Sequence, residues 1–413
     1  MAHVLVIGGG IVGLACAHAL VKDGHAVTVL DRDPDGDKCS RGNAGAIAAT
    51  EVVPAAAPGV IWQVPRWLLD PLGPLSVRPA HVPRLLPWLW RFLRAGQASE
   101  VARIAGALAA LNLRAHDDVA PLLADIGLAA DLHRVGALTV YESVAGYARD
   151  RAEWALRHAL GIVCEELSGA EARAMEPALG PIVQCGVFMP AWSHVSDPAR
   201  IVDALLAWLR GRGVAVLVGE AVDILSSDSV AERVVTADGR SLPVELLLIA
   251  AGAWSGRFAA RAGDPVLLES ERGYNTTLPQ AGLSVGRELI FAERKFVATP
   301  LAIGLRIGGA AEFAGLEAPA HPARAKALLT LARRYLPGLQ AAGGREWMGN
   351  RPATPDSLPV IGRSPRRRNV LYAFGHGHLG LTQAATTGRL VAELAQGRPP
   401  SVSLEPYAIE RFR

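Results

Sequence analysis

Glycines near the N-terminus have the spacing that a dinucleotide-binding turn requires. A predicted strand at 3–7 leads into the G-x-G-x-x-G motif Gly8–Gly13, and a predicted helix follows at 14–23. A second strand is predicted at 26–30, and the acid Asp31 comes directly after it. Gly8 allows a tight turn, Gly10 lets the backbone approach a pyrophosphate, and Gly13 lets the helix pack closely on the strand. The helix N-terminus presents unpaired N–H groups and a positive dipole to phosphates. The pattern therefore predicts a dinucleotide site in which Asp31 binds a ribose, without distinguishing NAD from FAD.

Arg351 is the leading candidate for binding an anionic substrate. It opens the segment Arg351-Pro352-x-Thr354-Pro355-Asp356. A planar guanidinium can bind a carboxylate through two parallel hydrogen bonds and so fix its orientation. The alternative is a structural ion pair with a nearby acid such as Asp356. Tyr274 could donate a further hydrogen bond to the same carboxylate, or it could be an ordinary sheet tyrosine.

A second glycine-rich junction lies near the C-terminus. An apolar strand, 370–374, leads into Gly375-His376-Gly377-His378-Leu379-Gly380-Leu381-Thr382, and a helix runs on to about residue 395. This junction again places backbone N–H groups at a helix N-terminus. His376 and His378 are two residues apart in a flexible turn and lack a third ligand at usable spacing, so no metal site is predicted. We expect them to shape the turn, with His376 beside the substrate.

Composition excludes several classes of function. Lysine plus arginine exceed aspartate plus glutamate by only 42 − 39 = 3, which is too balanced for an electrostatic nucleic-acid binder. The four cysteines include no C-x-x-C pair, so neither a zinc knuckle nor an iron–sulfur site is predicted, and a reducing, cytoplasmic compartment is expected. Residues 1–21 contain no charged side chain, but three consecutive glycines interrupt this run and argue against a targeting or membrane-spanning segment.

The order of the elements predicts an α/β fold with a discontinuous dinucleotide-binding domain. Apolar strands typical of a parallel sheet occur at 3–7 and 26–30 and return at 214–217 and 246–249. Strands typical of an antiparallel sheet are predicted at 267–278, 288–299 and 304–309. We therefore expect the first domain to comprise 1–50, 190–260 and 345–413, and a substrate domain to comprise 51–189 and 261–344.

A stretch rich in tryptophan and proline, 67–93, has two interpretations. Its last part, from Pro87 to Ala95, alternates large apolar side chains with arginine. Such a helix can pack its apolar face on the core or lie on a membrane surface. The core-facing interpretation is favoured, and a peripheral contact with the inner face of a membrane stays open.

With these motifs in hand, the chain resembles the D-amino-acid oxidase superfamily of flavoproteins, and within it the bacterial D-amino-acid dehydrogenases. The resemblance covers nearly the whole length and rests on the N-terminal glycines with Asp31, on Ser40-x-x-Asn43-Ala44-Gly45, on Ala251-Gly252-Ala253-Trp254-Ser255, and on the Arg351 and Gly375 segments in tandem. The segment Glu271-Arg272-Gly273-Tyr274 is similar to relatives that act on cyclic imino acids such as hydroxyproline.

The resemblance implies a noncovalently bound FAD and assigns residues to it. Those expected to hold the cofactor are Gly8, Gly10, Ile11, Val12, Gly13, Asp31, Arg32, Ser40, Asn43, Ala44, Gly45, Val222, Ala251, Gly252, Trp254, Gly377, His378, Leu379, Gly380, Leu381 and Thr382. The substrate is expected to contact Arg351, Tyr274 and His376. Val222 would meet the adenine through its backbone, and Cys39 is expected to be a small residue of the loop rather than a covalent attachment point.

The activity implied by the resemblance is oxidation of the Cα–N bond of a D-amino acid or a cyclic imino acid, such as cis-4-hydroxy-D-proline, by hydride transfer to the flavin. No side chain is expected to act as a catalytic acid or base. One alternative is a secondary-amine oxidase of the glycine or sarcosine type. Others are a subunit, catalytic or silent, of a larger complex, or an NAD(P)-dependent dehydrogenase that uses the N-terminal motif alone. The electron acceptor could be oxygen, a quinone or a partner subunit.

Overall fold

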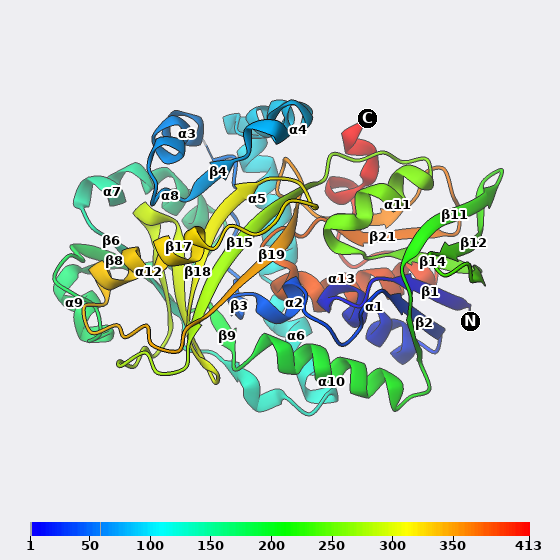
Figure 1. Ribbon diagram of the computed structural model, residues 1–413, viewed down its shortest axis with the longest axis horizontal. Helices are drawn as coiled ribbons and strands as arrows, with labels where there is room; N and C mark the ends of the chain where they lie inside the picture. Colours follow the sequence, from blue (N-terminus) through cyan, green and yellow to red (C-terminus); the bar gives the residue numbers. More distant parts are fainter. Residues whose placement is uncertain (1, 58) are drawn as a thin grey trace.

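A six-stranded sheet forms one half of the molecule (Figure 1). The computed structural model describes residues 2–57 and 59–413. In spatial order the strands are β10 (Ala215–Val218), β2 (Ala26–Asp31), β1 (His3–Ile7), β14 (Leu246–Ile249), β21 (Val370–Phe374) and β20 (Val360–Arg363). All neighbours are parallel except β20, which runs antiparallel to β21. β1 thus lies between β2, the next strand in sequence, and β14, which comes from a distant part of the chain.

Both faces of this sheet are buried, which explains why its central strands are apolar at every position. Val4 and Val6 face a core that includes α1 (Ile11–Lys22), α10 (Pro198–Arg210) and α13 (Gly380–Ala395). Leu5 and Ile7 face the opposite core, under α11 (Ser255–Arg261) and the meander β11 (Ala221–Ser227), β12 (Val230–Thr236) and β13 (Ser241–Pro243). A strand buried on both faces loses the polar alternation of a half-exposed one.

A nine-stranded sheet forms the other half. Its strands are β19 (Arg345–Ala353), β15 (Glu269–Leu278), β18 (Gly304–Phe313), β17 (Phe296–Leu301), β16 (Glu288–Phe291), β6 (Ala137–Tyr141), β8 (Cys185–Met189) and β7 (Glu165–Ser168), with β4 (Leu75–Val77) beside β18. Leu328, Leu331 and Tyr335 of α12 (Ala323–Tyr335) join the core on one face of it. This arrangement, a Rossmann-like sheet beside a second sheet with helices, is the predicted α/β fold class.

The second sheet differs in detail from the prediction. The predicted strand 288–299 is two strands, β16 and β17, because the chain turns at Ala292–Arg294 and Lys295 takes a left-handed conformation with φ of 54°. The sheet is mixed, since β16 runs parallel to β6 and β4 runs parallel to β18. β19 pairs along its whole length with β15, whereas the boundary expected at residue 345 groups it with the six-stranded sheet.

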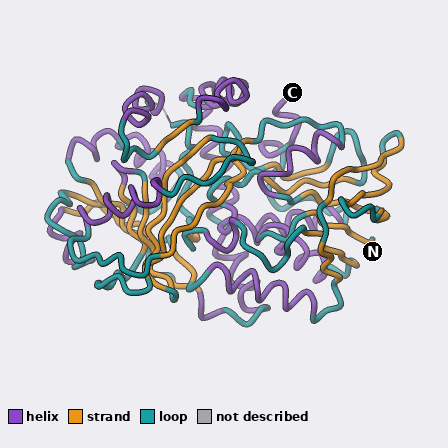
Figure 2. Tube along the Cα trace, in the orientation of Figure 1, coloured by secondary structure: helices purple, strands orange, loops and turns teal. Residues whose placement is uncertain are grey.

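The remaining helices surround these sheets (Figure 2). They are α2 (Cys39–Gly42), α3 (Val60–Leu69), α4 (Val82–Ala95), α5 (Ala98–Asn112), α6 (Ala115–Asp125), α7 (Val144–Arg149), α8 (Arg151–Ala159) and α9 (Gly169–Met175). The small sheet β3 (Ala46–Ile47), β9 (Ser193–Val195) and β5 (Leu132–His133) joins the two halves. In the part of the chain that the structure describes, no helix is both long and apolar enough to cross a membrane.

The close packing of α13 on α1 gives a test of the core. A Cβ added at Gly388 would lie 2.6 Å from the carbonyl oxygen of Ala15, whereas one added at the exposed Gly106 of α5 would meet nothing within 4 Å. We expect Gly388→Ala to lower the free energy of unfolding by about 1–3 kcal/mol through overpacking. Gly106→Ala should instead raise it by about 0.5–1 kcal/mol because it removes backbone entropy from the unfolded chain. Urea denaturation followed by circular dichroism measures both, and equal signs for the two variants would contradict this packing.

Candidate active site

A cavity of about 1230 Å³ extends from the first sheet to the second. Its walls come from the β1–α1 turn, the end of β2, the α2 loop, the segment after β14, the strands β15, β18 and β19, and the β21–α13 turn. These are the carboxyl ends of parallel strands on one side and the exposed face of a sheet on the other. Such a junction of elements is where ligands bind in open α/β folds.

The N-terminal glycines are required by close contacts between backbones. Gly8 has a φ of 113°, and a Cβ there would lie 2.3 Å from the carbonyl oxygen of Ala250. A Cβ on Gly13 would lie 2.0 Å from the carbonyl oxygen of Gly8. Gly8 and Gly10 line the cavity, whereas Gly13 does not and acts by letting α1 pack beneath the turn. The turn thus presents bare backbone to the cavity at the N-terminus of α1.

The loop around α2 supports that turn from the opposite side. The hydroxyl of Ser40 accepts a hydrogen bond from the N–H of Ile11 at 2.8 Å. The side chain of Asn43 holds the loop by donating to the carbonyl of Ser40 at 2.8 Å and accepting from the N–H of Gly45 at 2.8 Å. Ser40, Asn43 and Ala44 line the cavity, but Gly45 lies outside it. Its role is therefore to turn the chain rather than to contact a ligand.

Asp31 and its neighbours form the end of the cavity next to β2. The Asp31 carboxylate accepts hydrogen bonds from the N–H of Gly9 at 2.6 Å, from the N–H of Asp33 at 2.9 Å and from Lys38 Nζ at 3.0 Å. Because a carboxylate has about four acceptor positions, one remains for a ribose hydroxyl. The guanidinium of Arg32 stacks over the Trp254 ring at 4.1 Å, which places a flat cation at the cavity wall.

Val222, expected to meet the adenine through its backbone, follows directly on the cavity-lining Ala221. It is 40% exposed, on the outer meander, and does not line the cavity. The residues that reach the cavity from this segment are Gly219, Glu220 and Ala221. Val222 sits at an irregularity of the β11–β12 pairing, between Ala221 and Asp223, and its side chain turns outward there.

The β21–α13 turn forms the opposite end of the cavity. Gly375 and Gly377 have φ of 81° and 52°, which let the chain reverse before the helix begins. Residues from Gly377 to Thr382 line the cavity, and Leu379 precedes α13 without a side-chain cap. The N-terminus of α13 therefore directs N–H groups and a positive dipole into the cavity, as α1 does at the other end. Thr382 also fixes the adjoining loop by accepting from the N–H of Ala48 at 3.0 Å.

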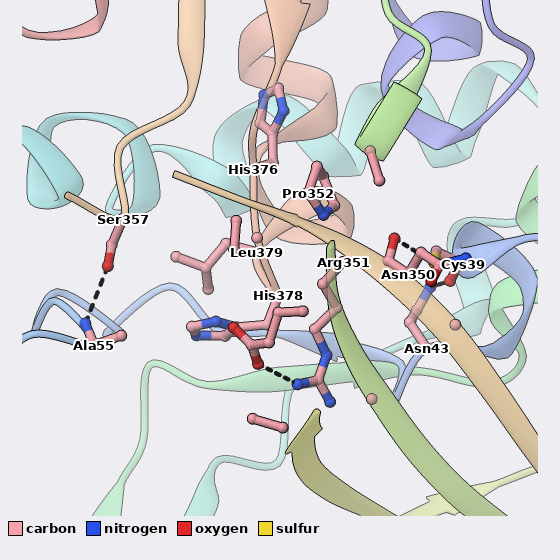
Figure 3. Close-up of a pocket in the computed structure, with 18 of the residues that line it drawn as sticks. Cys39, Asn43, Ala55, Asn350, Arg351, Pro352, Ser357, His376, His378 and Leu379 are labelled. Atoms are coloured by element: carbon pink, nitrogen blue, oxygen red, sulfur yellow. Dashed lines mark hydrogen bonds and ion pairs between the residues drawn. The ribbon is translucent and has the colours of Figure 1, made fainter. Parts of the chain in front are cut away.

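Arg351 lies in the cavity between the two sheets, and its partner is not the one expected. Its Nη1 donates to Glu271 Oε1 at 2.6 Å and to the carbonyl of Ala310 at 3.1 Å. Asp356, the acid considered from sequence, pairs instead with Arg411 at 2.8 Å. The Arg351 side chain is 25% exposed. Figure 3 shows its guanidinium pointing into the space beside His378.

The other two residues assigned to the substrate turn their polar groups away from the cavity. The Tyr274 hydroxyl donates to Glu312 at 2.5 Å and accepts from the N–H of His321 at 3.0 Å, and burial raises its pKa. The His376 ring contacts the Thr387 hydroxyl at 3.0 Å, and burial lowers the pKa of the ring to about 3, so it is neutral. Both residues reach the cavity, but as buried wall groups. The exposed imidazole in this turn is that of His378, while His376 points the other way (Figure 3).

Two acids and an aromatic wall complete the cavity without a signal in the local sequence. Glu271 lies two residues before Gly273 on β15, and the pairing of this strand with β19 places it beside Arg351. Glu288 also lines the cavity, accepts from Trp192 Nε1 at 2.9 Å, and has a pKa raised to about 8 by burial. The aromatic wall is formed by side chains from the larger sheet and from the helices and loops beside it: Trp88, Phe92, Tyr141, Trp154, Trp192 and Phe291. No local motif marks these residues.

The cavity fits an extended dinucleotide with a flat ring at one end. The β1–α1 turn presents the bare backbone of Gly8 and Gly10, Asp31 keeps an acceptor position, and the α13 N-terminus faces the far end of the same space. Cys39 is an unsuitable nucleophile for covalent attachment, because its thiol donates to the carbonyl of Asn350 at 2.9 Å and burial raises its pKa to about 12.

Comparison with known proteins agrees with this geometry. Residues 3–394 match the family model described as FAD dependent oxidoreductase, DAO. A D-amino-acid oxidase of Bradyrhizobium diazoefficiens is 35% identical over 99% of both chains, and a D-amino acid dehydrogenase of Methylobacterium radiotolerans is 31% identical over 99% of both. Among solved structures, glycine oxidase from Geobacillus kaustophilus superposes with a TM-score of 0.74 at 22% identity, over 98% of this chain and 97% of that one. This last likeness shows the fold.

The geometry and the comparisons lead to one family. The glycine turn and two helix N-termini face one cavity, and the family model matches nearly the whole length of the chain. The chain belongs to the DAO family of FAD-dependent oxidoreductases.

Proposed function

We propose that this chain oxidises the Cα–N bond of a D-amino acid or of a cyclic imino acid, such as cis-4-hydroxy-D-proline. The observation that carries the proposal is Arg351, a cation on the cavity wall at the junction of β19 with the β21–α13 turn. The names of the two curated relatives, a D-amino-acid oxidase and a D-amino acid dehydrogenase, support the substrate class. Bound FAD supplies the acceptor for a hydride from Cα.

The residues of the chain would act by binding, orienting and excluding water. Arg351 holds the substrate carboxylate and so fixes the direction of the Cα–H bond. The aromatic wall, which includes Trp192 and Tyr141, keeps water from the reacting centre. The positive end of α13 favours negative charge at the ring end of the cofactor. No side chain needs to remove a proton when the amine is already neutral, and the buried His376 is not placed to do so.

Two other functions keep specific support. A secondary-amine oxidase of the glycine or sarcosine type would use the same fold and an arginine for the carboxylate, as the superposition on a glycine oxidase allows. A catalytic subunit of a heteromeric dehydrogenase would use the same site and pass electrons to a partner, a quinone or oxygen.

The substrate is tested by visible spectroscopy of the untagged flavoprotein without oxygen. D- and L-amino acids, hydroxyprolines, sarcosine and glycine are added in turn, and bleaching of the flavin bands is followed. We expect D-amino acids or D-hydroxyproline to bleach the protein fastest. Readmitted air then separates an oxidase, which recolours at once, from a dehydrogenase. Bleaching only by sarcosine or glycine would support the secondary-amine oxidase, and bleaching only by dithionite would contradict every one of these activities for the isolated chain.

Arg351→Lys tests how the carboxylate is held. Lysine keeps the positive charge but loses the planar pair of donors. We expect kcat/KM for the best substrate to fall by about hundredfold, since breaking a buried charge-assisted contact costs roughly 2–5 kcal/mol. The matched control is Arg210→Lys, on a surface pair with Asp35 remote from the cavity. If Arg351→Lys has normal flavin content and an unchanged kcat/KM, Arg351 does not bind the substrate carboxylate.

We also propose that α3 and α4 contact an anionic membrane surface. α4 is two-sided: Trp88 is buried and donates to the carbonyl of Ala353 at 3.0 Å, whereas Trp90 is 63% exposed. Leu69 and Trp62 of α3 are also exposed. Residues 71–99 contain four arginines and no acid, so the charge of this region complements anionic lipid headgroups. A quinone dissolved in such a membrane would be a suitable electron acceptor.

The membrane contact is tested with Trp90→Glu on α4. A charge on the apolar side should oppose insertion, so we expect at least tenfold weaker binding to vesicles containing phosphatidylglycerol. Val144→Glu is the control, because Val144 is 68% exposed on α7, outside this surface. Cosedimentation with vesicles gives the partition, and equal partition of wild type and Trp90→Glu would exclude this surface as the contact.

A further inference from the structure

Glu271 is an acid beside the substrate-binding arginine for which the proposed reaction has no use. It lies on β15 directly opposite Arg351 on β19. The two side chains form an ion pair with 2.6 Å between Nη1 and Oε1, and both line the cavity. Gly273, the next residue of β15 on the same face, makes room for the guanidinium, since a Cβ there would lie 2.1 Å from Arg351 Nη2. The pair is therefore part of the cavity wall.

The hydrogen bonds of this pair leave one charged edge free on each partner. Nη1 of Arg351 is taken by Glu271 and the carbonyl of Ala310, and Nη2 reaches the carbonyl of Gly309 at 3.4 Å. Among residues 2–57 and 59–413, neither Arg351 Nε nor Glu271 Oε2 has a hydrogen-bond partner. The Nε edge can bind a carboxylate, and the second oxygen of Glu271 can accept from a cationic donor.

We infer that Glu271 and Arg351 together form a receptor for a zwitterion. The substrate carboxylate binds the free edge of Arg351, and the adjacent protonated nitrogen, as a primary or a cyclic secondary ammonium, binds Glu271. Binding in this form precedes the chemical step: the nitrogen releases its proton to solvent before the hydride leaves Cα, so the species oxidised is the neutral amine. This inference rests on the proposed function for the identity of the substrate. It adds that Glu271 determines specificity: a carboxylate that lacks a neighbouring cation meets the uncompensated charge of Glu271 and is rejected.

The main competing interpretation is that Glu271 only holds the guanidinium in place. In that case its loss would weaken the binding of every carboxylate to the same extent. A further possibility is that Glu271 occupies Arg351 until any carboxylate displaces it, and then its loss would strengthen the binding of every carboxylate. A zwitterion receptor alone predicts changes of opposite sign for ligands with and without an ammonium group.

Two ligands of the same shape separate these interpretations without turnover. 2-Aminoisobutyrate carries an ammonium group but no Cα hydrogen, so it cannot be oxidised, and pivalate has a methyl group in place of that ammonium. Dissociation constants are measured from the perturbation of the visible flavin spectrum of the oxidised protein. We expect wild type to bind 2-aminoisobutyrate at least tenfold more tightly than pivalate, as expected for one hydrogen bond between charged groups.

The variant Glu271→Gln keeps the shape of the side chain and removes its charge. We expect it to bind 2-aminoisobutyrate about tenfold more weakly and pivalate about tenfold more tightly. Glu271→Asp, which keeps the charge on a shorter chain, should retain a preference for the zwitterion. The matched control is Glu269→Gln on the same strand, because Glu269 pairs with His81 and does not line the cavity. This control should keep the wild-type ratio.

Each possible outcome either supports or overturns the inference. Loss of the preference in Glu271→Gln with its retention in Glu269→Gln supports the receptor. Two results would overturn it. One is a wild type that binds the two ligands equally well or prefers pivalate. The other is a Glu271→Gln protein in which the two dissociation constants change in the same direction or do not change. Because neither ligand is oxidised, this result does not depend on which substrate the bleaching experiment identifies, so a failure of the proposed function is recognised separately.

Discussion

The close approach of the β1–α1 turn to the end of β14 is the constraint on which the rest of this molecule depends. Gly8 lies so near the carbonyl of Ala250 that no side chain fits, and α1 can begin only because Gly13 passes the carbonyl of Gly8 at similar range. These contacts bring β1, α1 and β14 together although nearly 240 residues separate β1 from β14. They also leave bare backbone facing the cavity, so the same packing that closes the core leaves a surface of the kind that binds phosphates.

The second sheet completes the site because it meets the first along β19. This strand ends at Ala353, which bridges to His376 in the turn that precedes α13. Arg351 therefore lies two residues before the one that bridges to this turn, and the helix that follows the turn points its N-terminus at the cavity. A carboxylate held by Arg351 is placed between a sheet that carries its recognition groups and a helix end that can stabilise negative charge. One short stretch of backbone, the bridge between Ala353 and His376, thus connects the proposed substrate-binding arginine to the turn before α13.

The sequence predicts the elements whose signals are local and misses those set by pairing across the chain. The glycine turns, the apolar parallel strands and the fold class can be recognised from spacing of a few residues. The partner of Arg351 cannot be recognised in this way. The register between β15 and β19 brings Glu271 to it from 80 residues away. Asp356 is closer in sequence but pairs with Arg411 instead. Tyr274 was located on the correct strand, but the direction of its hydroxyl depends on Glu312 of β18. The irregularity of the β11–β12 pairing at Val222 is likewise unmarked by any local motif.

Charge balance explains why an ion pair can stand in a site built to bind a charged substrate. An isolated guanidinium in a cavity with apolar walls would be costly to desolvate, and Glu271 offsets that cost before any ligand arrives. A zwitterion carries a charge for each partner, so the net charge of the site does not change when the ligand binds. A simple carboxylate would leave the site with an excess negative charge in a medium of low dielectric constant, where such an excess is most unfavourable. In the proposed receptor, the pair that makes the resting site stable is therefore also the feature that selects amino acids from other acids.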